Sequence, residues 1–231
     1  AFTEATVYDP DCAMCYWGSA LVLGPNVNAD MDPSNAGRAH VLATRAMNLS
    51  KNAQPWEKDL IAALGKRYKP EEPEDRTELN NAYAFAMREV AGTYPGNTDI
   101  VALYAEALMD QHPWDFWDED GQARPWTPEI QRTLEWALGD NPNHIGAIHL
   151  YIHAMEQSNS PQLAEPYADK LADLAPTAGH LVHMPAHIYM RVGRYHDSTL
   201  NNMRATVADN EFIAACRSNS PIYLAGYIPH N

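Results

Sequence analysis

Apolar residues recur at intervals of three and four along most of the chain, with polar residues between them. In the segment HIGAIHLYIHAMEQS, for example, Ile145, Ile148, Ile152 and Met155 form such a stripe. Because an α-helix completes a turn every 3.6 residues, positions with this spacing lie on one face. The pattern predicts amphipathic helices that bury their apolar faces together, and therefore an all-α fold.

The predicted helices come in pairs. Residues 55–68 pair with residues 77–94, and residues 99–111 pair with residues 128–138. Between helices lie segments rich in Pro, Gly, Asn and Asp, which are typical of loops. Three of these segments are long enough to be insertions: GPNVNADMDPSN, KPEEPEDR and HPWDFWDEDGQARPWTP.

The second half of the chain repeats itself at a fixed interval. Pro142 and Pro176 are 34 residues apart, and the same offset relates His149 to His183 and His153 to His187. Upstream the interval stretches to about 42, 43 and 47 residues, which the insertions explain. Several residue types that recur at one period indicate a repeated structural unit.

A 34-residue unit of two helices resembles the tetratricopeptide repeat. The motifs AFTEATVYDP, CAMCYWGSALVL and GRYHDS match the packing positions and the interhelical turn of that repeat. The resemblance implies a right-handed α-solenoid of about five helical hairpins, with loop insertions in the first three, that forms a single domain over residues 1–231. The repeats are expected near residues 1–10 (partial), 11–52, 53–95, 96–142, 143–176, 177–210 and 211–231 (partial).

A narrower resemblance connects the chain to bacterial, exported tetratricopeptide-repeat proteins of unassigned activity. It depends on the blocks DPDCAMCYWGSALVLGPNVN, HLYIHAMEQS, HLVHMPAHIYMRVGRYHDS and YIPHN. It implies a periplasmic or extracellular location. Because the chain begins and stops within expected helix pairs, we expect a piece of a longer protein, or ends covered by further repeats or another subunit.

The histidines form a pattern that is repeated at this interval. His149, His153 and Glu156 are expected on one helix face, beside the apolar stripe and toward the concave groove. One period later the equivalent positions hold His183, His187 and Met190, with His180 one turn before. Imidazoles on neighbouring helices could converge on one zinc, copper or iron ion. The predicted metal ligands are therefore His149, His153, His183, His187 and Glu156.

Three interpretations of these histidines stay open. In the first, they form a metal site, and the alternative function is then a metal-dependent enzyme in which Glu156 acts as the acid or base. In the second, they line a groove that binds a protein or peptide partner. In the third, they form hydrogen bonds with neighbouring groups and bind nothing. No HExxH motif is present, so an enzyme is not favoured. The predicted groove residues are His180, Met190, Glu106, Asp110, Trp114 and Trp117, the two tryptophans belonging to an aromatic insertion that could instead be pinned to the helices by its own side chains.

Composition and charge exclude several classes. The net charge is −14 and only sixteen Lys and Arg residues are scattered along the chain, which argues against binding to nucleic acid. No apolar run approaches the roughly 20 residues that a membrane-spanning helix needs. The function that the sequence favours is a binding or scaffold protein with a His-rich groove that recognises a partner and holds a transition metal.

Three cysteines are too few for a disulfide scaffold. In the motif DCAMCY, Tyr16 replaces the histidine that covalent haem attachment requires, so no covalent haem is expected. We expect Cys12 and Cys15 to pack as small residues in a helix, with a disulfide from one of them to Cys216 as the alternative in an oxidising compartment.

Overall fold

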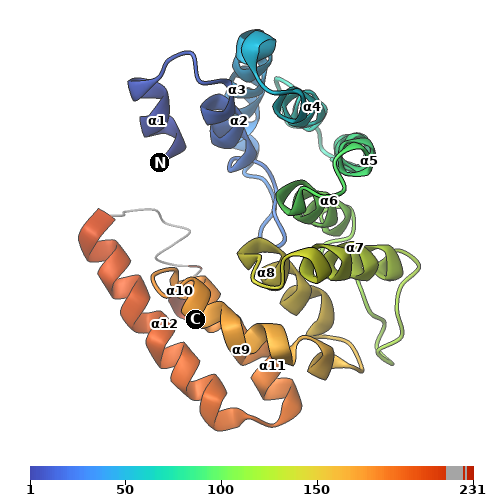
Figure 1. Ribbon diagram of the computed structural model, residues 1–231, viewed down its shortest axis with the longest axis vertical. Coiled ribbons are helices and arrows are strands. Elements are labelled where there is room, and N and C mark those ends of the chain that lie inside the picture. Colours follow the sequence, from blue (N-terminus) through green and yellow to red (C-terminus); the bar gives the residue numbers. More distant parts are fainter. Residues whose placement is uncertain (217–225, 227) are drawn as a thin grey trace. The chain divides into compact units, whose positions relative to one another are not determined.

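The computed structural model describes residues 1–216, 226 and 228–231, and this part of the chain is all-helical (Figure 1). Over the described residues no strand forms; there are only two isolated bridges, Asn26 with Ala29 and Trp117 with Ala123. The all-α prediction is thereby confirmed. The chain divides into two compact units, Ala1–Trp114 and Asp115–Asn231.

The first unit contains six α-helices and two short 3-10 helices within its described residues. In chain order they are α1 (Phe2–Tyr8), α2 (Ala13–Leu21), η1 (Pro33–Asn35), α3 (Ala36–Leu49), η2 (Ser50–Asn52), α4 (Pro55–Leu64), α5 (Thr77–Thr93) and α6 (Thr98–Met109). Successive helices pack on each other from α1 to α6. The expected helices at residues 55–68, 77–94 and 99–111 correspond to α4, α5 and α6 and begin within one residue of the predicted positions.

Helix α4 shows how local sequence determines such a start. Pro55 occupies the first turn, where its missing N–H group costs nothing. Gln54 and Glu57 form a capping box around the free backbone N–H groups of that turn. The apolar face then buries Leu60, Ile61 and Leu64. The apolar face is the feature from which this helix was predicted, and the capped start explains where it begins.

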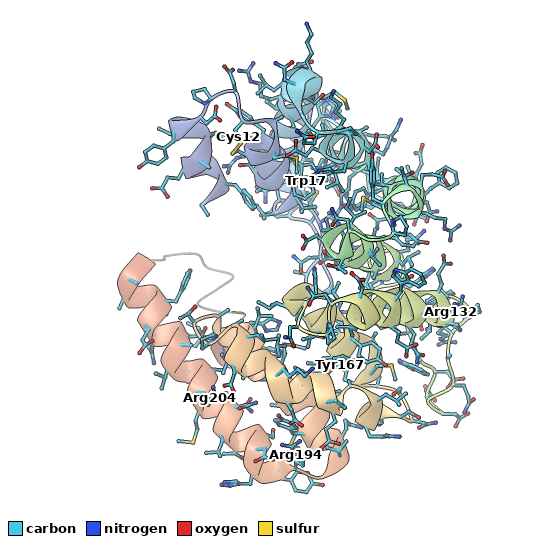
Figure 2. The ribbon with its side chains drawn as sticks, in the orientation of Figure 1. Cys12, Trp17, Arg132, Tyr167, Arg194 and Arg204 are labelled. Atoms are coloured by element: carbon cyan, nitrogen blue, oxygen red, sulfur yellow. A yellow bond between two sulfur atoms is a disulfide. The ribbon has the colours of Figure 1, made fainter. Side chains whose placement is uncertain are left out.

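Cys12 and Cys15 form a disulfide, which corrects the expectation of two packed thiols (Figure 2). Cys12 is the N-cap residue of α2, and its sulfur accepts a hydrogen bond from the backbone N–H of Cys15 at 3.1 Å. This cap brings the two side chains together, because residues three apart in the first turn of a helix are neighbours. The alternative pairing of either cysteine with Cys216 is therefore wrong.

The second unit contains the remaining described helices. They are α7 (Thr127–Asp140), α8 (Ile145–Met155), η3 (Pro161–Leu163), α9 (Glu165–Leu174), α10 (Gly179–His183), α11 (Pro185–Val192), α12 (Tyr195–Cys216) and α13 (Ile228–His230). Helix α8 packs on α7 and α9, and α12 packs on both α10 and α11. The long helix α12 passes through Asn210, where the 34-residue period had placed the end of a repeat.

The core of this unit is built from the predicted apolar stripes. Ile148, Ile152 and Met155 of α8 are each no more than 1% exposed, whereas Ile145, the fourth residue of the predicted stripe, is 36% exposed at the start of the helix. Farther along, Val182 of α10 packs in a cluster with Ala172 of α9 and Ala205 of α12. These contacts fix the rotation of α8 and α10 about their axes, and so decide where their histidines point.

Pro185 interrupts the helix in which three of the histidines lie. Helix α10 ends at His183, Met184 links it to α11, and Pro185 occupies the first turn of α11. A proline inside a helix removes one hydrogen bond and crowds the preceding turn. The break separates His180 and His183 on α10 from His187 on α11.

None of the described helices is both long and apolar enough to cross a lipid bilayer. The last predicted repeat, residues 211–231, lies partly outside the described residues, since 217–225 and 227 are not described. From that region the structure describes the end of α12 and the short helix α13.

Candidate metal centre

Six imidazole rings meet in the second unit. They come from four helices: His149 and His153 from α8, His180 and His183 from α10, His187 from α11 and His230 from α13. We call these six side chains the histidine cluster. The four histidines that the 34-residue period related to each other all belong to it, and so does His180.

Helix α8 presents His149 and His153 together because they are four residues apart on one face. Burial of the apolar stripe on the other face of α8 fixes the direction in which these two histidines point. His153 itself is only 1% exposed, so the cluster reaches into the interior of the unit. At the start of the helix, the His144 ring accepts a hydrogen bond from Ala147 N–H at 3.0 Å. His144 therefore serves as a helix cap.

Helix α10 is held in place at its first residue. The backbone of Gly179 lies so close to the buried side chain of Asp209, from α12, that a Cβ atom at this position would come within 1.9 Å of an Asp209 carboxylate oxygen. Only glycine allows this approach. The other carboxylate oxygen of Asp209 accepts a hydrogen bond from the Asn231 side chain at 2.8 Å. One buried carboxylate thus positions both α10 and the segment that carries His230.

The cluster consists of two groups of three rings. We call His149, His153 and His180 the first triad, and His183, His187 and His230 the second triad; in each, one nitrogen from every ring lies within 4.8 Å of the other two. In the first triad the Nε2 atoms of His149 and His180 are 3.3 Å apart. In the second triad the Nε2 atoms of His183 and His187 are 2.9 Å apart.

The outward-facing nitrogens of three rings have acceptors that fix their tautomers. The Nδ1 atom of His183 lies 2.8 Å from the amide oxygen of Asn202 on α12. The Nδ1 atoms of His153 and His187 lie 3.0 and 2.6 Å from the two carboxylate oxygens of Glu156. Because these oxygens can only accept, each Nδ1 carries the proton. The Nε2 atoms of neutral rings then expose lone pairs.

Burial and the neighbouring rings keep most of these histidines neutral. Together they lower the pKa of His180 to about 3 and that of His183 to about 4, and they hold the pKa of His149 well below its usual value. Burial also lowers the pKa values of His153 and His230. Neutral imidazole is the form that binds metal ions.

Glu156 accepts hydrogen bonds from two rings of the cluster. Burial alone would raise its pKa, but the hydrogen bonds from His153 and His187 outweigh that effect and lower the pKa to about 2. Each of its oxygens faces the Nδ1 side of a ring. Glu156 therefore lies behind the imidazoles, on the side opposite to the Nε2 lone pairs.

Sequence reasoning missed two residues of this site. His230 lies 43 residues beyond His187, outside the 34-residue period, and its only signal was the block YIPHN. Asn202 orients His183 from α12 and lies 19 residues away from it, which also does not match the 34-residue period. When a histidine or asparagine does not follow the repeat period, the sequence gives no indication of which helix face or neighbouring residue it will contact.

The other predicted groove residues have different surroundings. Met190 lies on α11 and is 54% exposed. The indole N–H of Trp117 donates to the backbone oxygen of Ala154 at 2.6 Å, and Phe116 beside it is buried. The aromatic insertion is thus pinned by its own side chains, the alternative that the sequence left open. Trp114, at the end of the first unit, is 42% exposed.

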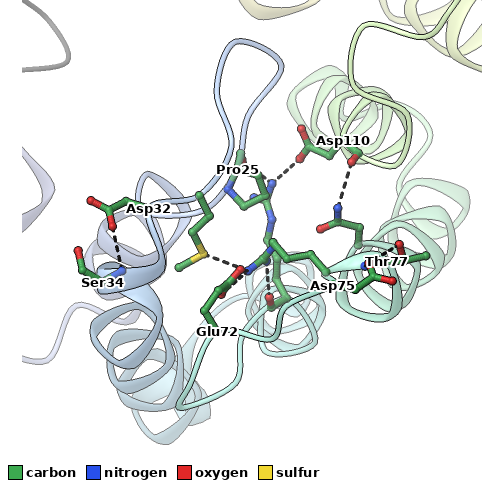
Figure 3. A network of polar contacts seen from close by, with 11 residues as sticks. Pro25, Asp32, Ser34, Glu72, Asp75, Thr77 and Asp110 are labelled. Atoms are coloured by element: carbon green, nitrogen blue, oxygen red, sulfur yellow. Dashed lines mark hydrogen bonds and ion pairs between the residues drawn. The ribbon is translucent and has the colours of Figure 1, made fainter.

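Asp110 lies in a buried ionic network of the first unit (Figure 3), and Glu106 of α6 lies in the same unit near it. The guanidinium of Arg67 forms an ion pair with Asp110 and donates a hydrogen bond to the backbone oxygen of Pro25 at 2.6 Å. Asp110 is only 5% exposed, so its carboxylate is not on the surface as a groove residue would be. Burial and the nearby Asp110 raise the pKa of Glu106 to about 7.

Comparison with known proteins adds no assignment. No protein-family model matches the chain, and no curated protein matches its sequence.

Proposed function

We propose that this protein binds transition-metal ions through the histidine cluster. The observation that carries the proposal is the distance of 2.9 Å between the Nε2 atoms of His183 and His187, whose Nδ1 atoms both face acceptors. Two unprotonated nitrogens so close repel each other unless a cation lies beside both of them. A metal ion that accepts both lone pairs removes this repulsion.

The donor set indicates the class of metal. All six candidate ligands are imidazoles, which suit zinc, copper and iron, whereas the hard ions calcium and magnesium prefer oxygen ligands. The net charge of −14 adds a general attraction for cations. The proposal therefore keeps the three metals that the sequence suggested and puts His180 and His230 among the ligands.

Glu156 is assigned to a positioning role. A carboxylate that accepts hydrogen bonds from metal-binding histidines orients the rings and raises their basicity. Both of its oxygens already face His153 and His187, and its pKa of about 2 keeps it ionised. These contacts favour orientation over the roles of metal ligand or general acid, which the sequence had left open for this residue.

Elemental analysis tests the proposal directly. Protein purified in metal-free buffers and exposed to zinc or copper should retain near-stoichiometric metal after gel filtration. The double variant His153→Ala with His187→Ala should lose it, because it removes one ring from each triad. The matched control is His196→Ala, an exposed histidine on α12 that should bind as the wild type does. Wild-type protein that retains no metal, and whose melting temperature is unchanged by chelator, would contradict the proposal.

We also propose that the helix pairs are tetratricopeptide-like repeats of a solenoid with a scaffold role. The support is that His149 and His183, one period apart, and likewise His153 and His187, converge in one cluster. Equivalent positions of stacked repeats meet in this way. Recognition of a protein or peptide partner stays a prediction, which pull-down from the native source in the presence of chelator would test.

An exported location fits the same proposal. The Cys12–Cys15 disulfide supports it, because disulfides persist in oxidising compartments and are rare in the cytosol. Thiol counting under denaturing conditions, on protein isolated from its natural source, should find both cysteines oxidised. Free thiols at both positions would argue against export.

A further inference from the structure

We infer that the histidine cluster is a two-metal centre, in which each triad holds one ion and Glu156 couples the two. This inference rests on the proposed metal binding and specifies its stoichiometry. The sequence had suggested a single ion shared by four histidines. The arrangement of the six rings favours two.

The first step concerns the number of donors. Zinc and copper bind imidazole nitrogens at about 2.0–2.1 Å, so all ligands of one ion lie within about 4.2 Å of each other. Within the described residues the six rings form two groups of three, and in each group one nitrogen from every ring lies within 4.8 Å of the others. Each group contains one Nε2 pair, at 3.3 Å in the first triad and 2.9 Å in the second. Two complete sets of ligands are therefore present.

The second step concerns the distance between the triads. Ring centroids from different triads are 6.1 Å apart for His180 and His183, 6.0 Å for His153 and His187, and 5.6 Å for His180 and His230. These values overlap the spacing within a triad, which reaches 6.0 Å for His153 and His180. Ions in the two triads would consequently be neighbours, as in other two-metal sites.

The third step concerns Glu156. Its Oε1 atom faces His153 of the first triad, and its Oε2 atom faces His187 of the second. One carboxylate therefore fixes the tautomer of a ring in each triad. Its side chain is buried, with 12% exposed, so neither contact is easily exchanged for water. Binding of an ion in one triad orders the carboxylate that orients a ligand of the other.

Each ion would have three protein ligands. Sites with three protein ligands keep a position open for water or a small ligand, whereas structural zinc sites are closed by four. The second triad also offers access from solvent, because His230 is exposed and the His187 side chain is 21% exposed. The centre is thus built to bind small molecules on two adjacent ions.

Copper provides the decisive experiment. Metal-free protein receives zero to four equivalents of Cu(II), unbound copper is removed by gel filtration, and copper per chain is measured by elemental analysis and by the integrated electron paramagnetic resonance signal. Wild-type protein should retain two copper ions per chain. At two equivalents the spectrum should show dipolar broadening and a half-field transition, because neighbouring Cu(II) ions interact magnetically.

Two single variants separate the triads. His149→Asn should remove the tight site of the first triad, and His183→Asn that of the second, so each variant should retain one copper with its full signal. His196→Ala, outside the cluster, should still retain two. Circular dichroism in chelator verifies that each variant is folded. If a variant fails to fold, wild-type protein still tests the arrangement, since the half-field transition should grow with added copper up to two equivalents and not beyond.

The outcomes separate this inference from the proposed function. No bound copper overturns both. One copper per wild-type chain supports metal binding but overturns the two-metal centre, as does a variant pair in which either change removes all copper. Two coppers without dipolar broadening or a half-field transition overturn the two-metal centre and leave two distant sites.

Discussion

The ionic network of the first unit and the histidine cluster of the second differ in how their polar groups are paired. In the network, the cation and the anion both come from the chain, since Arg67 pairs with Asp110 and also donates to Pro25. In the second triad of the cluster, the facing atoms are of one kind, namely the Nε2 atoms of His183 and His187, which are 2.9 Å apart while both rings carry their proton on Nδ1. Complementary groups close a structure by themselves, whereas like groups that face each other require something from outside.

The contrast separates structural from functional polar burial. A buried ion pair whose hydrogen bonds are supplied by the protein is part of the fold. The neutral imidazoles of the histidine cluster are held together by the packing around them, namely by the apolar stripe of α8 and the close contact at Gly179. The first arrangement should fail when one partner is removed, and the second should change when a metal ion is supplied.

The largest expected effect is on the network. Arg67→Ala leaves the Asp110 carboxylate buried without its partner, which should lower the free energy of unfolding by about 3–5 kcal/mol. Urea unfolding in chelator, followed by circular dichroism, measures the change. The control is Lys69→Ala, which breaks the exposed Lys69–Glu78 pair in the same unit and should cost less than about 1 kcal/mol. Equal effects of the two variants would show that the buried pair carries no special stability.

A second change acts on the packing that positions the cluster. Gly179→Ala forces a Cβ atom against Asp209 and should lower the free energy of unfolding by about 1–3 kcal/mol. Metal affinity should fall as well, because α10 carries a ligand of each triad. Gly139→Ala, on α7, is the matched control: its Cβ atom meets nothing within 4 Å, so stability should rise slightly. A Gly179→Ala protein with wild-type stability and affinity would show that the contact is not needed.

A third change distinguishes orientation from ligation. Glu156→Gln keeps one acceptor oxygen but presents an amide NH₂ group to the other ring, so metal affinity should fall by about 10–100-fold. Competition against a colorimetric chelator measures the affinity, and the exposed Glu211→Gln on α12 should be unchanged. Complete loss of binding would indicate that Glu156 is itself a ligand, as the sequence suggested. Unchanged affinity would remove Glu156 from the site.

Sequence reasoning reached the cluster but not the network, for a physical reason. Helix starts follow from local signals such as the Gln54–Glu57 capping box, and the faces of α8 and α10 follow from apolar spacing. The repeat period then related His149 to His183 without reference to the fold. Arg67 and Asp110 are 43 residues apart and follow no period, so nothing local indicates that they will pair.

The same limit applies to the completion of the site. His230 reaches the cluster through a short helix at the end of the chain, and Asn231 holds that helix by a hydrogen bond to Asp209. That contact joins residues 22 positions apart. A pattern that relies on regular spacing finds the ligands on stacked helices. It misses a ligand that lies outside the repeat interval.

The smallest expected effect is a pH dependence that has opposite signs in the two regions. The pKa of Glu106 is raised to about 7 from an ordinary value of 4.5, so the folded state holds a proton that the unfolded state releases. The stability contributed by this group is present below pH 4.5 and is lost as the pH rises to about 7. The histidines behave in the opposite way: their lowered pKa values cost stability as the pH falls below 6.5.

Glu106→Gln isolates the first of these terms. The amide introduced by this substitution cannot titrate, so the difference in unfolding free energy between wild type and variant should shift by about 1–2 kcal/mol between about pH 5 and pH 8, with the wild type losing the more. Urea unfolding at the two pH values, in chelator, measures it; the histidine terms are common to both proteins and cancel in the subtraction. A difference that does not change with pH would mean that Arg67 stabilises the ionised forms of both Glu106 and Asp110. The network would then contain two ionised carboxylates and one guanidinium, so its charges would not balance. The contrast with the histidine cluster, which contains no cation of its own, would then apply only to the Arg67–Asp110 pair.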